Sequence, residues 1–183
     1  SFGLAAAHSF YPGKNLGAFG DAGAITTDNE EIANLVRVLS NYGSSKKYVF
    51  DYIGENSRLS ELDAAVLSVK LRHLDRDNNR RKEIAKMYYD GIKNPLVRMP
   101  SKLPPEENVF HVFPIFTERR DELQVYLKEQ GVGTIIHYPI PPHKQKAYKE
   151  WNSLSFPVTE KIHSQELSIP MSPALTDEQA QYV

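Results

Sequence analysis

The chain opens with short segments of small and apolar side chains, bounded by residues that favour turns. Residues 5–11 read Ala-Ala-Ala-His-Ser-Phe-Tyr and predict a short buried strand, which ends at Pro12 and Gly13. Residues 17–27 join glycines to a β-branched end, and they predict a second strand with glycines where another backbone approaches. Residues 46–57 are aromatic without a clear period, and we expect an irregular loop there.

Apolar side chains at helical spacing predict the helices. The spacing first appears over residues 30–39, where Asp28 or Asn29 supplies the N-cap. A longer periodic segment runs over residues 59–92, and its first part has the wide apolar face that is typical of a helix buried on more than one side. Because residues 75–82 are polar, we expect either one long helix or a kinked pair that bridges two lobes.

The second half predicts a smaller α+β unit. Pro114 favours an edge position or a bulge in the first of its strands. Helices are expected at 119–130, which ends at Gly131, at 144–151, at 157–167 and from Thr176 onward, and strands at 110–116, 133–138 and 168–171. We therefore expect an α/β chain of two domains, residues 1–78 and 79–183, joined by a long helix.

Composition excludes several classes of function. The formal net charge of −1 gives no basic field that would attract nucleic acid or a membrane surface. No apolar run approaches the roughly 20 residues that span a bilayer, and residues 1–7 lack the basic start and long apolar core of a signal peptide. The chain contains no cysteine, so disulfides and thiolate chemistry are absent, which fits a reducing cytoplasm.

Lys14 is the candidate for chemistry near the start of the chain. Its neighbours are small and apolar, which suits a lysine that reacts with an aldehyde cofactor, and Ser9 lies nearby as a donor for a phosphate. A plain surface lysine after a Pro-Gly turn is the alternative. A P-loop is excluded because His8 and Asn15 stand where the motif needs Gly and Ser or Thr.

Two other polar clusters have alternative interpretations. His137 and His143 flank a proline-rich loop. The loop either lines the site of a polar ligand or is a rigid loop with two partly exposed histidines. As a metal-binding pair, the two histidines lack a third ligand. Asn56 and Arg58 either form the loop that precedes a helix or donate hydrogen bonds to an anion. No Gly-x-Ser-x-Gly motif is present to support a serine hydrolase.

Together these motifs resemble the C-terminal half of pyridoxal phosphate (PLP)-dependent nucleotide-sugar aminotransferases of the DegT/DnrJ type. The resemblance covers essentially the whole chain, and its first block is highly specific. The matching blocks are residues 9–17 (Ser-Phe-Tyr-Pro-Gly-Lys-Asn-Leu-Gly), 20–24, 54–59, 64–65, 71, 74–75, 131–134 and 137–139. It implies an aspartate-aminotransferase-like fold, of which this chain supplies part of the large, PLP-binding domain and a small α+β domain.

The resemblance also implies roles for single residues. Lys14 corresponds to the family's Schiff-base lysine, which moves protons between the donor and the cofactor. Ser9 corresponds to a serine that binds the PLP phosphate, and Asn56 to an asparagine that reaches the phosphate in the other subunit of a homodimer. Arg58 and His137 correspond to positions near the substrate.

The implied function is transfer of an amino group from glutamate, through PLP, to a keto sugar nucleotide. The run from Gly133 to His143 most resembles members that act on a dTDP-linked 3-keto-6-deoxyhexose. The alternatives are a non-catalytic dimerisation or binding fragment, and a PLP dehydratase, although that relative replaces the lysine with histidine. His8 departs from the family pattern. Because the family's first half has no counterpart here, we expect the chain to be part of a longer protein.

Overall fold

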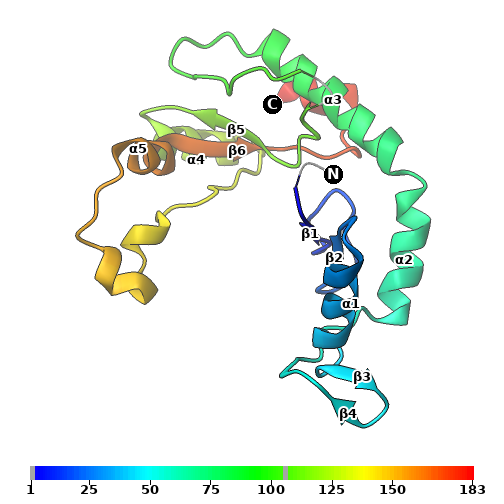
Figure 1. Ribbon diagram of the computed structural model, residues 1–183. Helices are drawn as coiled ribbons and strands as arrows, with labels where there is room; N and C mark the ends of the chain where they lie inside the picture. The colour runs from blue at the N-terminus through cyan, green and yellow to red at the C-terminus, as the bar shows by residue number, and fades with distance from the viewer. Residues whose placement is uncertain (1–2, 105–106) are drawn as a thin grey trace. The chain divides into compact units, whose positions relative to one another are not determined.

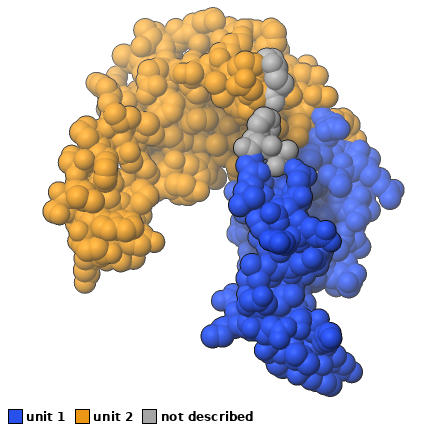
Figure 2. All heavy atoms as spheres, in the orientation of Figure 1, with its two compact units in different colours: residues 1–75 blue, residues 76–183 orange. Residues whose placement is uncertain are grey.

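The computed structural model describes residues 3–104 and 107–183. The chain forms two compact units, residues 1–75 and 76–183 (Figure 2). The sequence placed this division after residue 78, within the same polar stretch. That the two units are parts of a large and a small domain stays a prediction.

The first unit begins with an antiparallel pair of strands, β1 (Ala6–Ser9) and β2 (Gly23–Thr26) (Figure 1). Both strands form where the sequence predicts them. The expected burial of the first strand is wrong, because every residue of β1 and of β2 is exposed. A two-stranded sheet buries side chains only where another layer covers it. The exposure of both strands shows that the described elements of this unit leave the sheet largely uncovered.

Two glycines allow close backbone approach in this hairpin, as the sequence predicts. A Cβ atom on Gly23 would lie 2.7 Å from the carbonyl oxygen of His8 on the paired strand. A Cβ atom on Gly17 would lie 2.3 Å from the carbonyl oxygen of Pro12. Any larger residue at either position would force the backbone apart, so both glycines are needed for the loop that carries Lys14.

Local signals place the next helix, α1 (Glu30–Leu39). The side chain of Asn29 accepts a hydrogen bond from the backbone N–H of Ile32 at 3.0 Å, which is the N-cap contact that the sequence predicts. The following segment differs from the expected irregular loop, because β3 (Ser44–Lys46) and β4 (Val49–Phe50) form a short hairpin. Its turn depends on Tyr48, whose φ of 68° no apolar pattern reveals.

The long periodic segment forms two helices, α2 (Glu61–Leu71) and α3 (Leu74–Gly91), which is the kinked-pair alternative. The polar residues 75–82 are helical. The expectation that the first part is buried on more than one side is wrong: in the described structure Leu67 is the one buried residue of α2, and Leu62 is 82% exposed. Much of its wide apolar face is uncovered in the described structure.

The core of the second unit lies on a sheet of two antiparallel strands, β5 (Phe113–Phe116) and β6 (Glu166–Ile169). β5 is shorter than the predicted strand and contains Pro114 at an interior position. β6 begins earlier than expected. The strand predicted at 133–138 is reduced to one bridge, between Ile135 and Ser168, because the proline-rich sequence that follows cannot extend the ladder.

Aromatic and aliphatic side chains fill this core. Tyr88 of α3 packs edge-to-face on Phe113, with ring centroids 5.1 Å apart. Helix α4 (Arg120–Glu129) adds Leu127, and Gly131 follows it with a φ of 79°, as its predicted C-terminal position requires. The buried cluster comprises Ile84, Ala85, Tyr88, Phe110, Phe113, Ile115, Leu127, Val132, Leu167, Ile169 and Ala180.

Shorter helices complete the second unit. They are the 3-10 helices η2 (Pro142–Lys144) and η3 (Lys146–Trp151), and the α-helices α5 (Pro157–Gln165) and α6 (Asp177–Tyr182). Thr176 caps α6 in a capping box with Gln179, which confirms the predicted cap. Among the helices described, none combines the length and the apolar character that crossing a membrane requires.

Candidate functional site

A pocket of about 750 Å³ in the first unit brings four of the five candidate residues together. Ser9 and Lys14 come from the end of β1 and the turn after it, and Asn56 and Arg58 come from the segment before α2. The remaining lining residues are Tyr11, Asp21, Ala22, Gly23, Ser57 and Leu59. Segments more than 40 positions apart in the sequence therefore meet at the site.

The turn that follows β1 positions Lys14. Its backbone N–H donates to the carbonyl oxygen of Tyr11 at 2.8 Å, which closes the turn that Pro12 and Gly13 predict. The backbone N–H of Ala18 donates to the carbonyl oxygen of Phe10 at 2.7 Å and returns the loop to the strand. Lys14 itself is half-buried and lines the pocket.

Helix α2 holds the far side of the same loop. Oδ1 of Asp63 accepts a hydrogen bond from the backbone N–H of Phe19 at 3.0 Å, and Nζ of Lys70 donates to the carbonyl oxygen of Gly17. Hydrogen bonds from the Ser60 hydroxyl and from the Phe19 N–H lower the pKa of Asp63 below its usual value. Helix α2 contributes no residue to the pocket lining, but its hydrogen bonds fix the loop beside Lys14.

Arg58 orients the amide of Asn56. Its Nε donates to Oδ1 of Asn56 at 3.0 Å, and its Nη1 donates to Oδ1 of Asn41 at 2.8 Å. The guanidinium also lies over the ring of Tyr42, 5.2 Å from the centroid. Because the amide oxygen of Asn56 faces Arg58, its NH₂ group is left to donate elsewhere.

Ser9, like Asn56, has its oxygen occupied as an acceptor and keeps a hydrogen to donate. Its Oγ accepts a hydrogen bond from the backbone N–H of Tyr11 at 3.4 Å, so the hydroxyl hydrogen remains to be donated. The pocket therefore combines a primary amine, from Lys14, with hydroxyl, amide and guanidinium donors. Such a donor set suits an anionic ligand, and Asp21 is the one carboxylate on its lining.

His137 belongs to the second unit and is not part of this pocket. Its backbone N–H donates to Oε2 of Glu166 at 2.6 Å, and its Nδ1 lies 2.9 Å from Oγ of Ser168. His143, the second histidine of the proline-rich loop, is buried and has Nε2 at 2.9 Å from Oε1 of Glu160. Among the described residues, no group of three or more metal-ligating side chains could hold a metal ion. His137 and His143 belong to separate hydrogen-bonded networks.

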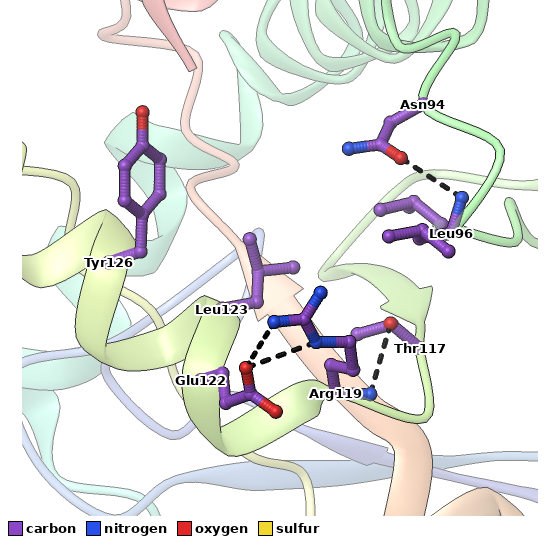
Figure 3. A pocket seen from close by; sticks show the side chains of 8 residues that line it. Asn94, Leu96, Thr117, Arg119, Glu122, Leu123 and Tyr126 are labelled. Atoms are coloured by element: carbon purple, nitrogen blue, oxygen red, sulfur yellow. Dashed lines mark hydrogen bonds and ion pairs between the residues drawn. The ribbon is translucent and has the colours of Figure 1, made fainter.

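A second hollow, of about 290 Å³, lies in the second unit and contains none of the candidate residues. Figure 3 shows that Arg119 and Glu122 pair with each other at the start of α4, while the backbone N–H of Leu96 donates to Asn94. Leu123 and Tyr126 supply its apolar lining. Its charged groups satisfy one another, which makes it a weaker ligand site than the pocket at Lys14.

Sequence reasoning missed several residues of the structure's polar sites. Tyr11 and Asp21 line the Lys14 pocket. They lie in the matching blocks 9–17 and 20–24, so their closeness in sequence to Lys14 was the available signal. Glu166 and Ser168, which contact His137, gave no local signal. Their contacts cross 29 and 31 positions of sequence and depend on where β6 lies.

Comparison with known proteins places these features in context. A family model described as the DegT/DnrJ/EryC1/StrS aminotransferase family matches residues 1–183. A dTDP-3-amino-3,6-dideoxy-alpha-D-galactopyranose transaminase of Aneurinibacillus thermoaerophilus is 54% identical, over 96% of this chain and 53% of the relative. A dTDP-3-amino-3,4,6-trideoxy-alpha-D-glucose transaminase of Streptomyces venezuelae is 46% identical, over 96% of this chain and 47% of the relative.

Solved structures agree with the sequence matches. The crystal structure of S. venezuelae DesV in complex with a ketimine intermediate superposes with a TM-score of 0.93 at 45% identity, covering 97% of this chain and 49% of that one. The NtdA protein of Bacillus subtilis with bound cofactor PMP superposes with a TM-score of 0.89 at 33% identity, covering 99% and 44%. These matches confirm the predicted fold class, and the chain spans about half the length of the curated relatives it matches.

Proposed function

Because the chain belongs to the DegT/DnrJ/EryC1/StrS aminotransferase family, we propose that it supplies the cofactor lysine of a PLP-dependent sugar aminotransferase. The observation that carries the proposal is the pocket in which Lys14 meets Ser9, Asn56 and Arg58. The relatives contain about as many residues again. The activity is therefore proposed for a protein that combines this chain with a counterpart of those residues.

The residues of the pocket fit one side of PLP. The amine of Lys14 suits the aldehyde carbon, and the hydroxyl of Ser9 and the NH₂ of Asn56 suit the phosphate. Both phosphate donors have their acceptor side occupied, Ser9 by a backbone N–H and Asn56 by Arg58, so hydrogens remain for an anion. When bound, PLP withdraws electrons from the carbon that carries the transferred nitrogen and so makes its proton removable.

The residues of this chain then have distinct tasks. Lys14 would hold the cofactor at its aldehyde carbon, and its amine would move a proton between the amino-acid carbon and the cofactor carbon. Ser9 holds the phosphate and thereby keeps the reacting carbon within reach of the lysine, and in a homodimer Asn56 would do the same for the partner's cofactor. Asp63 and Lys70 keep the loop of Lys14 in place from α2.

We propose glutamate as the amino donor and a keto sugar nucleotide as the acceptor, in particular a dTDP-linked 3-keto-6-deoxyhexose. Two relatives named as transaminases of dTDP-3-amino sugars, at 54% and 46% identity, support this choice. We place His137 and Arg58 near that substrate. We further propose a homodimer in which Asn56 serves the partner's site, and a cytoplasmic location, which the absence of cysteine supports.

The cofactor role of Lys14 is tested by adding PLP and reducing the mixture with borohydride. A visible absorbance band and a reduced adduct on the Lys14 peptide are expected, and Lys14→Ala should abolish both. Lys47→Ala serves as the control, because that exposed lysine also reacts if labelling is unspecific. An adduct distributed over surface lysines, unchanged by Lys14→Ala, would contradict the proposal.

Transfer of nitrogen separates the proposed activity from its alternatives. With nitrogen-15 glutamate, the label should appear in the amino sugar. A dehydratase on the same scaffold would consume the sugar nucleotide without incorporating the label. A non-catalytic binding fragment would show neither cofactor uptake nor any change in thermal stability in Lys14→Ala.

A further inference from the structure

Glu166 and Ser168 surround His137 in a closed network of three hydrogen bonds. The backbone N–H of His137 donates to Oε2 of Glu166 at 2.6 Å, the Ser168 hydroxyl donates to Oε1 of Glu166 at 2.6 Å, and Nδ1 of His137 lies 2.9 Å from Ser168 Oγ. Glu166 and Ser168 are 3% and 5% exposed. Water therefore has little access to the network, and its hydrogens have to be shared among these groups.

The number of hydrogens determines which ring nitrogen is protonated. An ionised carboxylate only accepts hydrogen bonds, and the 2.6 Å O–H···O distance lies in the range for a hydroxyl that donates to a charged oxygen. The single hydrogen of Ser168 is thus used on Glu166. The 2.9 Å contact with His137 then needs a hydrogen on Nδ1 of the ring.

The opposite arrangement fails on the same distances. If Ser168 donated to Nδ1, its oxygen would face the Glu166 carboxylate at 2.6 Å with no hydrogen between them. Two acceptor oxygens at that separation repel each other, and the buried carboxylate would lose one of its two donors. Neutral His137 therefore carries its hydrogen on Nδ1.

We infer that Glu166 and Ser168 make His137 a hydrogen-bond acceptor at Nε2, for a hydroxyl or N–H group of the sugar nucleotide. The inference rests on the proposed function for the identity of the ligand. Within the described part of the chain, Nε2 of His137 has no hydrogen-bond partner, and the side chain is half-buried. Phosphate oxygens only accept, so the neutral ring does not pair with them. Glu166 and Ser168 act through His137 and are positioning residues.

The carbonyl group of Tyr138, the residue after His137, has a hydrogen-bond partner outside the network of Glu166 and Ser168. Nδ1 of His163 lies 2.6 Å from the carbonyl oxygen of Tyr138. A carbonyl only accepts, so His163 also carries a hydrogen on Nδ1, for a reason that does not involve Glu166. His163 therefore serves as an internal reference for any measurement of the His137 ring.

Nitrogen-15 NMR of the ring nitrogens tests the inference on the 183-residue chain, at a mildly alkaline pH. Wild-type His137 is expected to show a protonated Nδ1 and a bare Nε2. His163 is expected to show the same pattern. A protonated Nε2 on wild-type His137 would overturn the inference whatever the protein's activity.

Glu166→Gln provides a sharper test, because it should reverse the ring. The glutamine oxygen has to face the His137 backbone N–H, so its NH₂ group faces Ser168 and donates to it. Ser168 then donates to Nδ1, and the hydrogen of His137 moves to Nε2. Ser168→Ala should give a mixture of both forms. An unchanged His137 ring in Glu166→Gln, with the His163 signals intact, contradicts the network; if that variant does not fold, Ser168→Ala decides.

Two ligands test the recognition role. A dTDP-linked 6-deoxyhexose, which has hydroxyl donors, should shift the Nε2 resonance, whereas pyrophosphate, which only accepts, should not. In Glu166→Gln the response to the sugar nucleotide should fall by about tenfold in affinity, which corresponds to the loss of one hydrogen bond. No shift with the sugar nucleotide overturns the recognition role and leaves the tautomer result standing, so the two failures are distinguishable.

Discussion

At the scale of single residues, Tyr88 shows how burial and one hydrogen bond combine. Its side chain is 2% exposed, and its hydroxyl donates to the carbonyl oxygen of Pro170 at 2.6 Å. Burial raises the pKa of Tyr88 to about 12, because the phenolate would lose its hydration in the core. The hydroxyl is therefore a donor throughout the neutral range.

We expect Tyr88→Phe to lower the free energy of unfolding by about 1–3 kcal/mol, since the partly buried hydrogen bond to the Pro170 carbonyl is lost. The ordinary pKa of a tyrosine is 10, so the stabilisation that Tyr88 provides is complete below pH 10. It is lost as the pH rises through the folded-state pKa of about 12. Urea unfolding across that range should be less pH-dependent in the variant.

Tyr89→Phe is the matched control for this prediction. The neighbouring ring also packs on Phe113, but the Tyr89 hydroxyl is exposed and lies 3.5 Å from the Ser101 carbonyl oxygen. Its removal should change stability by less than about 0.5 kcal/mol. Equal losses in the two variants would show that the Pro170 contact contributes nothing.

The roles of single residues were predictable from the sequence where their partners lie nearby in the chain. Lys14 and Ser9 belong to one short motif, and the glycines at 17 and 23 stand where backbone approaches within a hairpin. The partners of His137 were not predictable. Their hydrogen bonds require the register of β6, which is set by packing on α3 and β5 and not by nearby sequence.

At the scale of elements, the first turn of α2 has a task beyond starting a helix. Asp63 accepts the Ser60 hydroxyl and also the backbone N–H of Phe19. We expect Asp63→Asn to speed the hydrogen exchange of the Phe19 amide, because the neutral side chain is a weaker acceptor. Two-dimensional NMR against wild type measures this directly.

The pH dependence of this contact has a defined sign. The hydrogen bonds hold the pKa of Asp63 below its usual 3.8, so their stabilisation is present above that pH and is lost as the pH falls through the lower, folded value. The difference between Asp63→Asn and wild type should vanish in that acid range. Glu61→Gln, which removes a charge from the same turn, should leave the Phe19 amide unaffected.

Elements followed the sequence wherever a cap or a period defines them. Asn29, Thr176 and Gly131 are end signals within one turn of their helices, and all three are confirmed. Strands were less predictable, because a strand exists only if a partner pairs with it. The hairpin at 44–50 and the single bridge at Ile135 differ from expectation for that reason.

At the scale of the whole molecule, the two units differ in how much they bury. All members of the main apolar cluster lie between Ile84 and Ala180, whereas the buried apolar residues of the first unit are Ala18 and Leu67, among those described. Apolar burial is the principal source of stability. The second unit therefore has a core that the first unit lacks.

We expect hydrogen exchange followed by mass spectrometry to separate the units in the 183-residue chain. Amides of α3, β5 and β6 should exchange slowly, by global unfolding, and those of β1 and β2 should exchange faster by orders of magnitude. Equal protection in both units would mean that backbone pairing alone stabilises the first unit as well as the core stabilises the second.

Burial was the property that the sequence predicted least well at this scale. The apolar patterns of residues 5–11 and 59–71 predicted covered elements, and the structure leaves both largely exposed. Pattern identifies a face that favours burial, but a covering layer has to be present.

The exposed apolar side chains of the first unit have a consequence for the life of the protein in a cell. Leu62, Ile53 and Phe19 are each more than 80% exposed on the unit that carries Lys14. When the 183-residue chain is produced by itself, such a surface favours binding to chaperones and, at high concentration, the formation of inclusion bodies. Its yield should depend on what covers that surface during synthesis, so co-production with a covering partner would rescue it better than a lower temperature.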